Sequence, residues 1–210
     1  MSREKDCSTA VTLGISLPKH WDPMPYHGRT VHLVPLAVGS SEYQTVASKF
    51  HLTAQGFNIQ KIERVQNPHL YQSYVVRKQK MDQDNGGNNE RQLFHGTDAK
   101  NVTSINTQGF NKSFCGAHGV AFGRGVYFAR DASYSVGYAG GGAGSRYMYL
   151  ARVLVGQCCV GNSAMIVPPP KNPSIPEILY ESVVDNTGNP TIFVVFYDSQ
   201  CYPEYLITFK

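Results

Sequence analysis

The sequence predicts an α+β fold in which a mostly antiparallel sheet is flanked by helices. Apolar runs near the C-terminus follow one another without intervening helices, which favours antiparallel pairing over a doubly wound parallel sheet. A length of 210 residues with 41% apolar content is enough for one domain with a substantial core. We find no internal repeat and no second domain. We therefore expect a flexible N-terminal extension over residues 1–28 and a single domain over residues 29–210.

The first half of the chain alternates between strand and helix patterns. Ser40 or Ser41 can cap a helix that runs to about Leu52, because its apolar residues recur on one face. Asn67 and Pro68 form a cap followed by proline, the order typical of a second helix start. A polar loop rich in glycine and asparagine ends that helix. The strands expected here cover residues 30–38, 57–65 and the run that ends near residue 97.

The second half contains two short helices and several strands. Asp98 can cap a helix that ends at Gly109, and Asp131 can cap another that carries Tyr134 and Tyr138. The glycine-rich residues 140–144 lack the lysine and hydroxyl residue of a phosphate loop, which indicates an ordinary surface loop. Prolines at 168–170 and 173 mark a surface connection. The expected strands cover residues 147–155, 178–184, 192–197 and 205–209.

Composition excludes several functional classes. The net charge of +4 is mild and the basic residues are scattered, which argues against dedicated nucleic-acid binding. The five cysteines lack paired metal-ligand spacings, so we expect reduced thiols and no metal. The charged N-terminus has no signal-peptide core, and no apolar run approaches the length of a membrane span. These features predict an intracellular protein, cytoplasmic, nuclear or both, without a membrane partner.

Two apolar stretches carry the residues with the most chemical capability. One ends in His95-Gly96-Thr97, and the other runs from Gly123 to Ala129. The histidine can donate and accept hydrogen bonds, nearby tyrosines offer flat faces, and glycines let a ligand approach the backbone. This combination predicts a pocket for an aromatic group that bears an amide, with nicotinamide as the candidate. A dinucleotide-binding fingerprint is rejected, because Phe128 stands where its third glycine would be.

Together these stretches resemble the catalytic domain of the poly(ADP-ribose) polymerase-like, or diphtheria-toxin-like, ADP-ribosyltransferases. That family has a strand ending His-Gly-Ser/Thr, then Gly-Lys/Arg-Gly-hydrophobic-Tyr-Phe-Ala, then a helix reading Ser-x-Ser-x-x-Tyr, matched here by residues 133–138. Weaker similarity covers nearly the whole chain, from about Trp21 to Lys210. Residues 62–67 and 203–207 look most similar to the macrodomain-associated, mono-ADP-ribosylating branch. The resemblance implies the ADP-ribosyltransferase fold, a split sheet with flanking helices around a cleft for NAD⁺.

The resemblance also implies roles for individual residues. Gly96 would hold the nicotinamide carboxamide through its backbone, and Ser135 would add a hydroxyl to the same amide. Tyr138 would stack on the ring with Tyr127 packing opposite, and His95 would bind ribose hydroxyls. Residues 111–120 correspond to the loop that closes over the dinucleotide. The expected NAD⁺-binding set is completed by Thr97, Phe128 and Ala129.

The resemblance also implies a third catalytic position, which determines whether the product carries one ADP-ribose or a chain of them. Polymerising members carry a glutamate at the start of a strand near the C-terminus. Glu204 is followed by only six residues, too few for the final strand. Alignment on residues 192–196 instead places Ile192 there, so His95, Tyr127 and Ile192 form the expected catalytic set. Isoleucine cannot activate an acceptor, which predicts transfer of a single ADP-ribose assisted by the acceptor's own carboxylate.

The leading hypothesis is therefore a glycosyltransferase of the pentosyltransferase class. It would use NAD⁺ as co-substrate, modify protein side chains, including its own, and release nicotinamide. The alternative is an inactive module of the same fold that binds NAD⁺ or a partner. The intact His95, Tyr127, Ser135 and Tyr138 favour activity, whereas Val120, at a position where an aromatic is common, keeps the alternative open. A Cys/His hydrolase has no supporting motif.

Overall fold

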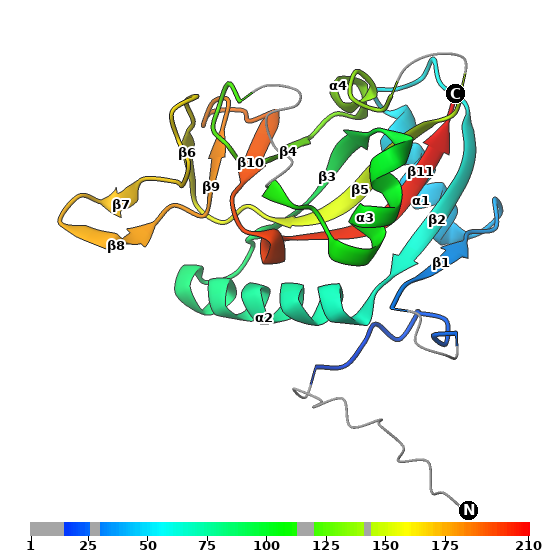
Figure 1. Cartoon of the computed structure of the whole chain (residues 1–210), viewed down its shortest axis with the longest axis horizontal. Helices are drawn as coiled ribbons and strands as arrows, with labels where there is room; N and C mark the ends of the chain where they lie inside the picture. Colours follow the sequence, from blue (N-terminus) through cyan, green and yellow to red (C-terminus); the bar gives the residue numbers. More distant parts are fainter. Residues whose placement is uncertain (1–14, 26–29, 113–119, 141–143) are drawn as a thin grey trace, which may run out of the picture.

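The computed structural model describes residues 15–25, 30–112, 120–140 and 144–210. Its centre is a nine-stranded sheet in the order β1-β2-β11-β5-β3-β4-β10-β9-β6 (Figure 1). Described pairs in this sheet are antiparallel, apart from the parallel β6–β9 pair. Its strands are β1 (His32–Pro35), β2 (Ile59–Gln66), β3 (Glu90–Thr97), β4 (Val126–Ala129), β5 (Arg146–Leu154), β6 (Cys158–Val160), β9 (Ser182–Val184), β10 (Ile192–Val195) and β11 (Cys201–Phe209).

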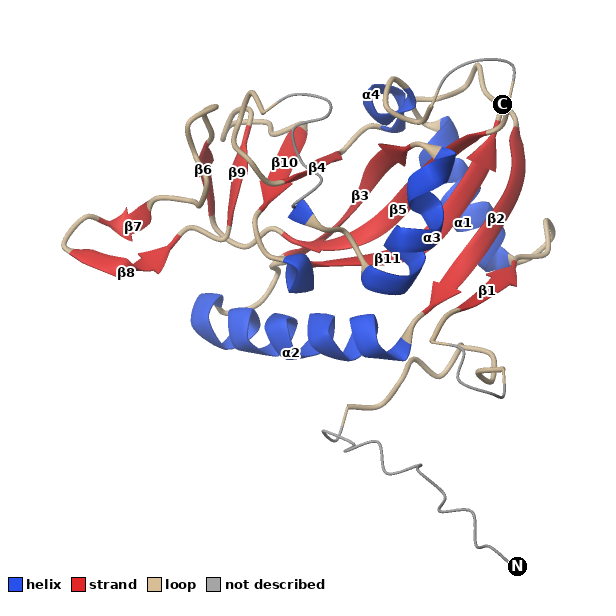
Figure 2. Cartoon of the chain, viewed as in Figure 1, coloured by secondary structure: helices blue, strands red, loops and turns tan. Residues whose placement is uncertain are grey.

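Helices cover both faces of this sheet, and the long helix after β2 packs against the ends of the central strands β5 and β11 (Figure 2). One face packs against α3 through an apolar cluster that includes Leu93, Ile105 and Tyr149. The opposite face packs against α1 and α4 through a cluster that includes Phe50 and Phe94. Leu93 and Phe94 are neighbours in β3, and successive side chains of a strand point to opposite faces, so the two clusters lie on either side of the sheet. The helices are α1 (Ser41–His51), α2 (Pro68–Asn85), α3 (Ala99–Gln108) and α4 (Ala132–Val136).

The sheet consists of two parts that meet at β3 and β4. β3 pairs with β5 along its whole length. Between β3 and β4, however, the register contains the single pair Phe94 and Ala129. β4 therefore diverges from β3 beyond this point. The α+β fold with a mostly antiparallel, split sheet agrees with the sequence-based prediction.

The two long helices begin as predicted. Ser40 is the N-cap of α1, and its hydroxyl accepts a hydrogen bond from the Tyr43 N–H at 3.2 Å. Asn67 caps α2 in the same way and is followed by Pro68 in the first turn. Gly86 ends α2 with a φ of +77°, a left-handed conformation that glycine adopts without steric cost. The cap predictions at Asp98 and Asp131 are right in position, but neither side chain makes a capping hydrogen bond.

The late strands differ from the prediction in several details. The run 178–184 is two strands in different sheets, because the chain changes partners between β8 (Ile175–Leu179) and β9. The proline-rich connection contains β7 (Pro170–Asn172), which pairs with β8 in a hairpin that projects from the end of the large sheet (Figure 1). The short strand β6 was not expected at all. Strands of three residues depend on tertiary pairing more than on local pattern.

The N-terminal part that the structure describes contacts the domain. Within residues 15–25, Trp21 stacks on Tyr202 of β11, with ring centroids 6.2 Å apart, and also contacts Tyr71 of α2. The Asp22 N–H donates to the Gln66 side chain at 2.9 Å. The boundary at residues 28 and 29 stays a prediction. Across the described residues, no helix is long and apolar enough to cross a membrane.

Candidate active site

His95 lies on β3 where this strand separates from β4. Its Nδ1 is 2.8 Å from the Tyr127 carbonyl oxygen. Since a carbonyl only accepts, Nδ1 carries the proton and donates it, which fixes the tautomer of the neutral ring. The ring packs edge-on against Phe110 and tilted against Phe128, with centroids 5.0 and 5.4 Å away. The histidine is therefore held in one orientation by β4 and by two aromatic rings.

Tyr127 sits on β4 with its hydroxyl turned back to its own loop. The hydroxyl donates to the Gly123 carbonyl and accepts from the Phe122 N–H, both at 2.9 Å. Its ring packs against an apolar cluster that includes Ile192. The tyrosine thus fixes the turn before β4 and links β4 to β10.

Gly96 and Ser135 bring the backbones of β3 and α4 into close contact. A Cβ added at Gly96 would lie 2.0 Å from the Ser135 carbonyl oxygen, closer than any real contact. Only glycine fits this position. Ser135 is 3% exposed, and its carbonyl also accepts from the Tyr138 N–H at 3.1 Å. The three residues expected at the nicotinamide are thereby brought together.

Tyr138 lies just beyond α4 and not within it, because the helix ends at Val136. This corrects the helix end that the sequence predicted. Tyr138 donates its hydroxyl hydrogen bond to Tyr134 at 3.2 Å, and the two rings are tilted by 37° with centroids 5.4 Å apart. Burial and the neighbouring Tyr138 hydroxyl raise the pKa of Tyr134 to about 12. Tyr134 is nevertheless 45% exposed, so the pair offers aromatic surface at the rim of the site.

Ile192 begins β10 directly beside β4. Its register partner on β4 is Ala129, which in turn pairs with Phe94 on β3. The isoleucine side chain is 4% exposed within the cluster that Tyr127 also contacts. His95, Tyr127 and Ile192 therefore lie on three adjacent strands, β3, β4 and β10.

Glu204 occupies a different part of the sheet. It lies on β11, which is separated from β10 by β5, β3 and β4. Its carboxylate accepts from Arg152 at 2.7 Å and from the Gln92 amide at 2.9 Å, and the residue is 5% exposed. Because its charge is paired with that of Arg152, this carboxylate is a buried structural group of the fold.

The remaining predicted site residues differ in accessibility. Phe128 and Ala129 are both 1% exposed and belong to the core. The Thr97 hydroxyl accepts a long hydrogen bond of 3.4 Å from Asn101, which ties the end of β3 to α3. Residues 113–119, most of the segment expected to close over the dinucleotide, lie outside the described residues, as do 141–143 of the glycine-rich loop.

Two other features bear on ligand chemistry. In the described ranges, no group of three or more His, Cys, Asp or Glu residues could hold a metal ion. A cavity of about 240 Å³ lies between α1 and the sheet, away from His95, and none of the predicted site residues lines it. The candidate site is the one formed by the strands and α4 and not this cavity, because the cavity contains none of the motif residues. It is lined by Ser41, Glu42, Thr45, Val46, Gln92, Leu150 and Tyr205.

Sequence reasoning missed two residues that shape the site. Phe110 supports the His95 ring, and Asp185 accepts a hydrogen bond from the Ile192 N–H at 3.2 Å. Neither carries a local motif, because both contacts arise only when distant segments pack together. The order Asp-Asn-Thr-Gly-Asn-Pro at residues 185–190 did offer one signal, since Asp and Asn commonly accept hydrogen bonds within turns.

Comparison with known proteins identifies the family. Residues 40–174 match the family described as the poly(ADP-ribose) polymerase catalytic domain. The protein mono-ADP-ribosyltransferase PARP14 of Homo sapiens is 49% identical over 200 residues, which cover 93% of this chain and 11% of that protein. The protein mono-ADP-ribosyltransferase PARP12 of Mus musculus is 42% identical over 209 residues, which cover 99% of this chain and 29% of that protein. PARP11 of Homo sapiens is 38% identical over 221 residues, which cover 93% of this chain and 64% of that protein.

This chain thus spans between 11% and 64% of the length of these curated relatives. The family match agrees with the arrangement of β3, β4, α4 and β10, which brings the motif residues His95, Gly96, Tyr127 and Ser135 together across adjacent elements. The chain therefore belongs to the poly(ADP-ribose) polymerase catalytic domain family.

Proposed function

We propose that this chain is a mono-ADP-ribosyltransferase, a glycosyltransferase of the pentosyltransferase class. It transfers one ADP-ribose unit from NAD⁺ to a protein side chain and releases nicotinamide. The observation that carries the proposal is the position of Ile192 on β10, beside the strand of Tyr127 and two strands from His95. The relatives PARP14, PARP12 and PARP11 are named protein mono-ADP-ribosyltransferases, which supports the same activity.

The nicotinamide half of NAD⁺ fits the edge of β3 at Gly96. Because β4 leaves β3 beyond Phe94, no register pair with β4 occupies this edge among the described residues. The Gly96 backbone holds the carboxamide, since an amide can donate and accept hydrogen bonds at once. Ser135 contributes its hydroxyl and Tyr138 stacks on the ring. The absence of a Cβ at Gly96 lets α4 approach β3 closely enough to bring Ser135 to the same site.

His95 acts on the adjacent ribose. With Nδ1 donating to the Tyr127 carbonyl, Nε2 of the neutral ring is the nitrogen that can accept from a ribose hydroxyl. This hydrogen bond orients the sugar relative to the nicotinamide. Fixed orientation matters here, because positioning supplies much of the rate when a weak nucleophile attacks a bound donor.

The transfer breaks one bond and forms one bond at ribose C1′. The electron pair of the C1′–N bond moves to the pyridinium nitrogen, and nicotinamide leaves as a neutral molecule. A lone pair on the acceptor oxygen or nitrogen forms the new bond to C1′. A carboxylate acceptor needs no base, whereas any other acceptor loses one proton to solvent or to a neighbouring group.

Ile192 explains why the product is a single unit. Elongation requires a base that activates a ribose hydroxyl of the previous unit, and an isoleucine side chain cannot accept a proton. Glu204 cannot replace it. This glutamate lies on β11, four places from β10 in the sheet order, and its carboxylate is bound by Arg152. The acceptors are then intracellular proteins of the cytoplasm or nucleus, this chain included, and their own carboxylates serve in place of the missing base.

Incubation of the chain with labelled NAD⁺, followed by gel and intact-mass analysis, tests the proposal. Discrete additions of one ADP-ribose are expected on the chain or on an added acceptor protein. A ladder of products would show polymerisation and contradict the role of Ile192. If NAD⁺ binds but no label is transferred, the chain is instead an inactive binding module of the same fold.

A further inference from the structure

The strand that carries Ile192 lies in the part of the sheet with the shortest strands. β10 has four residues, and β9 and β6 have three each, whereas β3, β5 and β11 have eight or nine. β4 is connected to β3 by a single register pair. Main-chain hydrogen bonds between the strands therefore fix the distance between Ile192 and His95 only weakly. Side-chain contacts must provide the remaining constraints on this distance.

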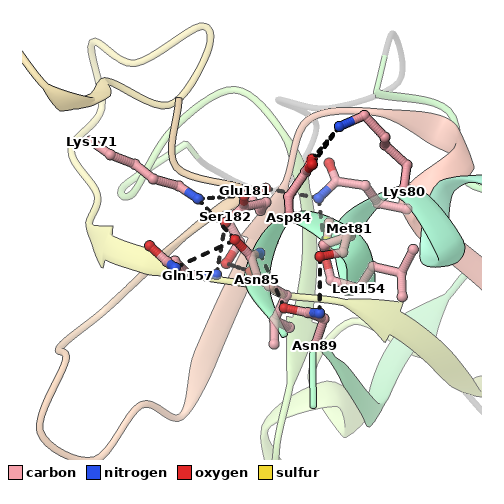
Figure 3. Close-up of polar contacts among 12 residues, drawn as sticks. Lys80, Met81, Asp84, Asn85, Asn89, Leu154, Gln157, Lys171, Glu181 and Ser182 are labelled. Atoms are coloured by element: carbon pink, nitrogen blue, oxygen red, sulfur yellow. Dashed lines mark hydrogen bonds and ion pairs between the residues drawn. The ribbon is translucent and has the colours of Figure 1, made fainter. Parts of the chain in front are cut away.

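Glu181 immediately precedes β9 and joins three segments of the chain (Figure 3). Its carboxylate accepts from Lys171 Nζ of β7 at 2.6 Å and from the Gln157 N–H at 2.8 Å. Its carbonyl accepts from the Gln200 side chain at 2.8 Å, just before β11 begins. The Lys171 and Glu181 side chains are 18% and 13% exposed, so solvent screens this ion pair less than a surface pair.

The space for this carboxylate depends on a glycine in the connection between β5 and β6. A Cβ at Gly156 would lie 2.8 Å from the Glu181 side chain, and the φ of +51° also favours glycine. The contacts extend to the end of α2, where Asn85 Oδ1 accepts from Lys171 Nζ at 3.3 Å and from the Gln157 side chain at 3.4 Å. We call Asn85, Gln157, Lys171 and Glu181 the Glu181 cluster.

The other end of the β9–β10 hairpin is held by Asp185. One carboxylate oxygen accepts from the Thr191 N–H at 2.9 Å and from the Ile192 N–H at 3.2 Å. The second oxygen accepts from the Thr191 hydroxyl at 2.5 Å. Burial alone would raise the pKa of Asp185, but these hydrogen bonds outweigh it and lower the pKa. The hairpin that contains Ile192 is thus held at its turn by Asp185 and at the start of β9 by Glu181.

We propose that Glu181, together with Lys171, is a positioning residue for the acceptor half of the transfer. Glu181 holds β9 in place, and β9 in turn pairs with β10, the strand of Ile192. The distance of β10 from β3 and β4 that results is the one that lets the acceptor reach ribose C1′. This inference rests on the proposed function. The groups assigned to nicotinamide lie on β3 and around α4, whereas Glu181 precedes β9, which β4 and β10 separate from β3 in the sheet order. Loosening the cluster should therefore impair transfer and spare NAD⁺ binding.

The test compares Glu181→Gln and Lys171→Met with the wild-type chain. Glutamine keeps the size and an acceptor for the Gln157 N–H but removes the charge. We expect kcat for transfer to fall about tenfold, because small misplacement of reacting groups is costly, while KM for NAD⁺ stays nearly constant. Water should take the place of the acceptor more often, so the ratio of free to protein-bound ADP-ribose should rise. The double variant should be no worse than either single one, because both remove the same contact.

The matched control is Lys80→Met, which removes the exposed Lys80–Asp84 ion pair drawn in the same view (Figure 3). Lys80 lies near the end of α2 but outside the Glu181 cluster, so this variant should keep wild-type kcat. The inference is overturned if the Glu181 and Lys171 variants behave like this control. It is also overturned if KM for NAD⁺ rises as much as kcat falls, which would indicate general damage to the fold.

Amide hydrogen exchange gives a result that does not depend on activity. In Glu181→Gln, the amides of β10 should exchange faster than in the wild type, while those of β3 should not change. Unchanged exchange in β10 would refute the positioning role even in an active enzyme. If the wild type transfers no label at all, the proposed function fails, whereas faster exchange in β10 would still show that the cluster holds this strand.

Discussion

Single residues determine how closely the backbones of β3 and α4 approach each other at the proposed nicotinamide site. Gly96 lets α4 contact β3, and His95 is oriented by one carbonyl and two aromatic rings. These residues were predictable from sequence, because the motif residues lie within short segments that fold locally. Phe110 and Asp185 were not, since their contacts with His95 and Ile192 exist only after the strands assemble.

Replacing Gly96 with alanine should damage both stability and binding. The added Cβ would overlap the Ser135 carbonyl oxygen, and overpacking of this kind typically costs about 1–3 kcal/mol in the free energy of unfolding. Benzamide, a nicotinamide mimic, should lose measurable affinity in calorimetry. Gly39→Ala is the control, since a Cβ there meets nothing within 4 Å. Normal benzamide binding by Gly96→Ala would remove Gly96 from the pocket.

Replacing Tyr138 with alanine should weaken NAD⁺ and benzamide together, because both would lose the same stacking face. Aromatic stacking contributes about 1 kcal/mol beyond area burial, equivalent to roughly fivefold to tenfold in affinity. Tyr138→Phe should retain most of the binding, since it keeps the ring and loses the hydroxyl that donates to Tyr134. Calorimetry that shows unchanged benzamide affinity in the alanine variant would place Tyr138 outside the pocket.

Replacing His95 with alanine should abolish transfer and leave the fold intact. The histidine is only partly buried, so its removal leaves a small gap, but the ribose loses its orienting hydrogen bond. Circular dichroism and urea unfolding monitor the fold, and labelled NAD⁺ monitors the activity. A folded variant that keeps most of the wild-type rate would exclude His95 from the reaction.

Whole elements were predictable where a local signal marks their ends. The caps at Ser40 and Asn67 and the glycine after α2 carry such signals, and both helices form where expected. β8 and β9 were read as one strand because their apolar pattern is continuous, yet the chain changes sheets between them. The break is marked by backbone hydrogen bonds to partners distant in sequence, from Tyr180 to Pro169 and from Glu181 to Gln157.

Replacing Ile192 with glutamate tests the role of β10. The new carboxylate would lie among apolar side chains such as Val183 and Phe196, and burying an unpaired charge costs several kcal/mol. We expect activity to fall and the products to remain single units, because elongation also needs a surface that holds the growing chain. Gel and mass analysis of both proteins provide the measurement. Chains made by the wild type would show that another carboxylate serves as the base.

At the scale of the whole molecule, the described core contains several fully buried tyrosines. Tyr74, Tyr149 and Tyr202 lie at 1% exposure or less, in two of the four apolar clusters. Their hydroxyls are paired, Tyr149 with the Val102 carbonyl and Asn106 and Tyr202 with the Val65 carbonyl. Burial raises the pKa of each, since an ionised phenol would be desolvated.

The stability of the domain should therefore fall steeply in alkaline solution. Above the unfolded tyrosine pKa of 10.0, the unfolded chain releases protons that the folded chain keeps. The stabilisation is fully present below this pH and is lost as the pH rises toward the folded values, by about 1.4 kcal/mol per pH unit for each such tyrosine. Urea unfolding between pH 8 and 11, with tyrosinate absorbance, measures the slope. Tyr149→Phe should reduce it, and an unchanged slope would contradict the assignment.

The central place of β11 has a consequence for biosynthesis. Tyr205 pairs with Arg64 on one side and with Leu150 on the other, so the last long strand closes the sheet between segments made much earlier. Until β11 leaves the ribosome, β2 and β5 each present an unpaired edge to solvent, and such edges promote aggregation. Completion of the sheet must wait for this strand, and nascent chains that stall before residue 201 should need a chaperone to remain soluble.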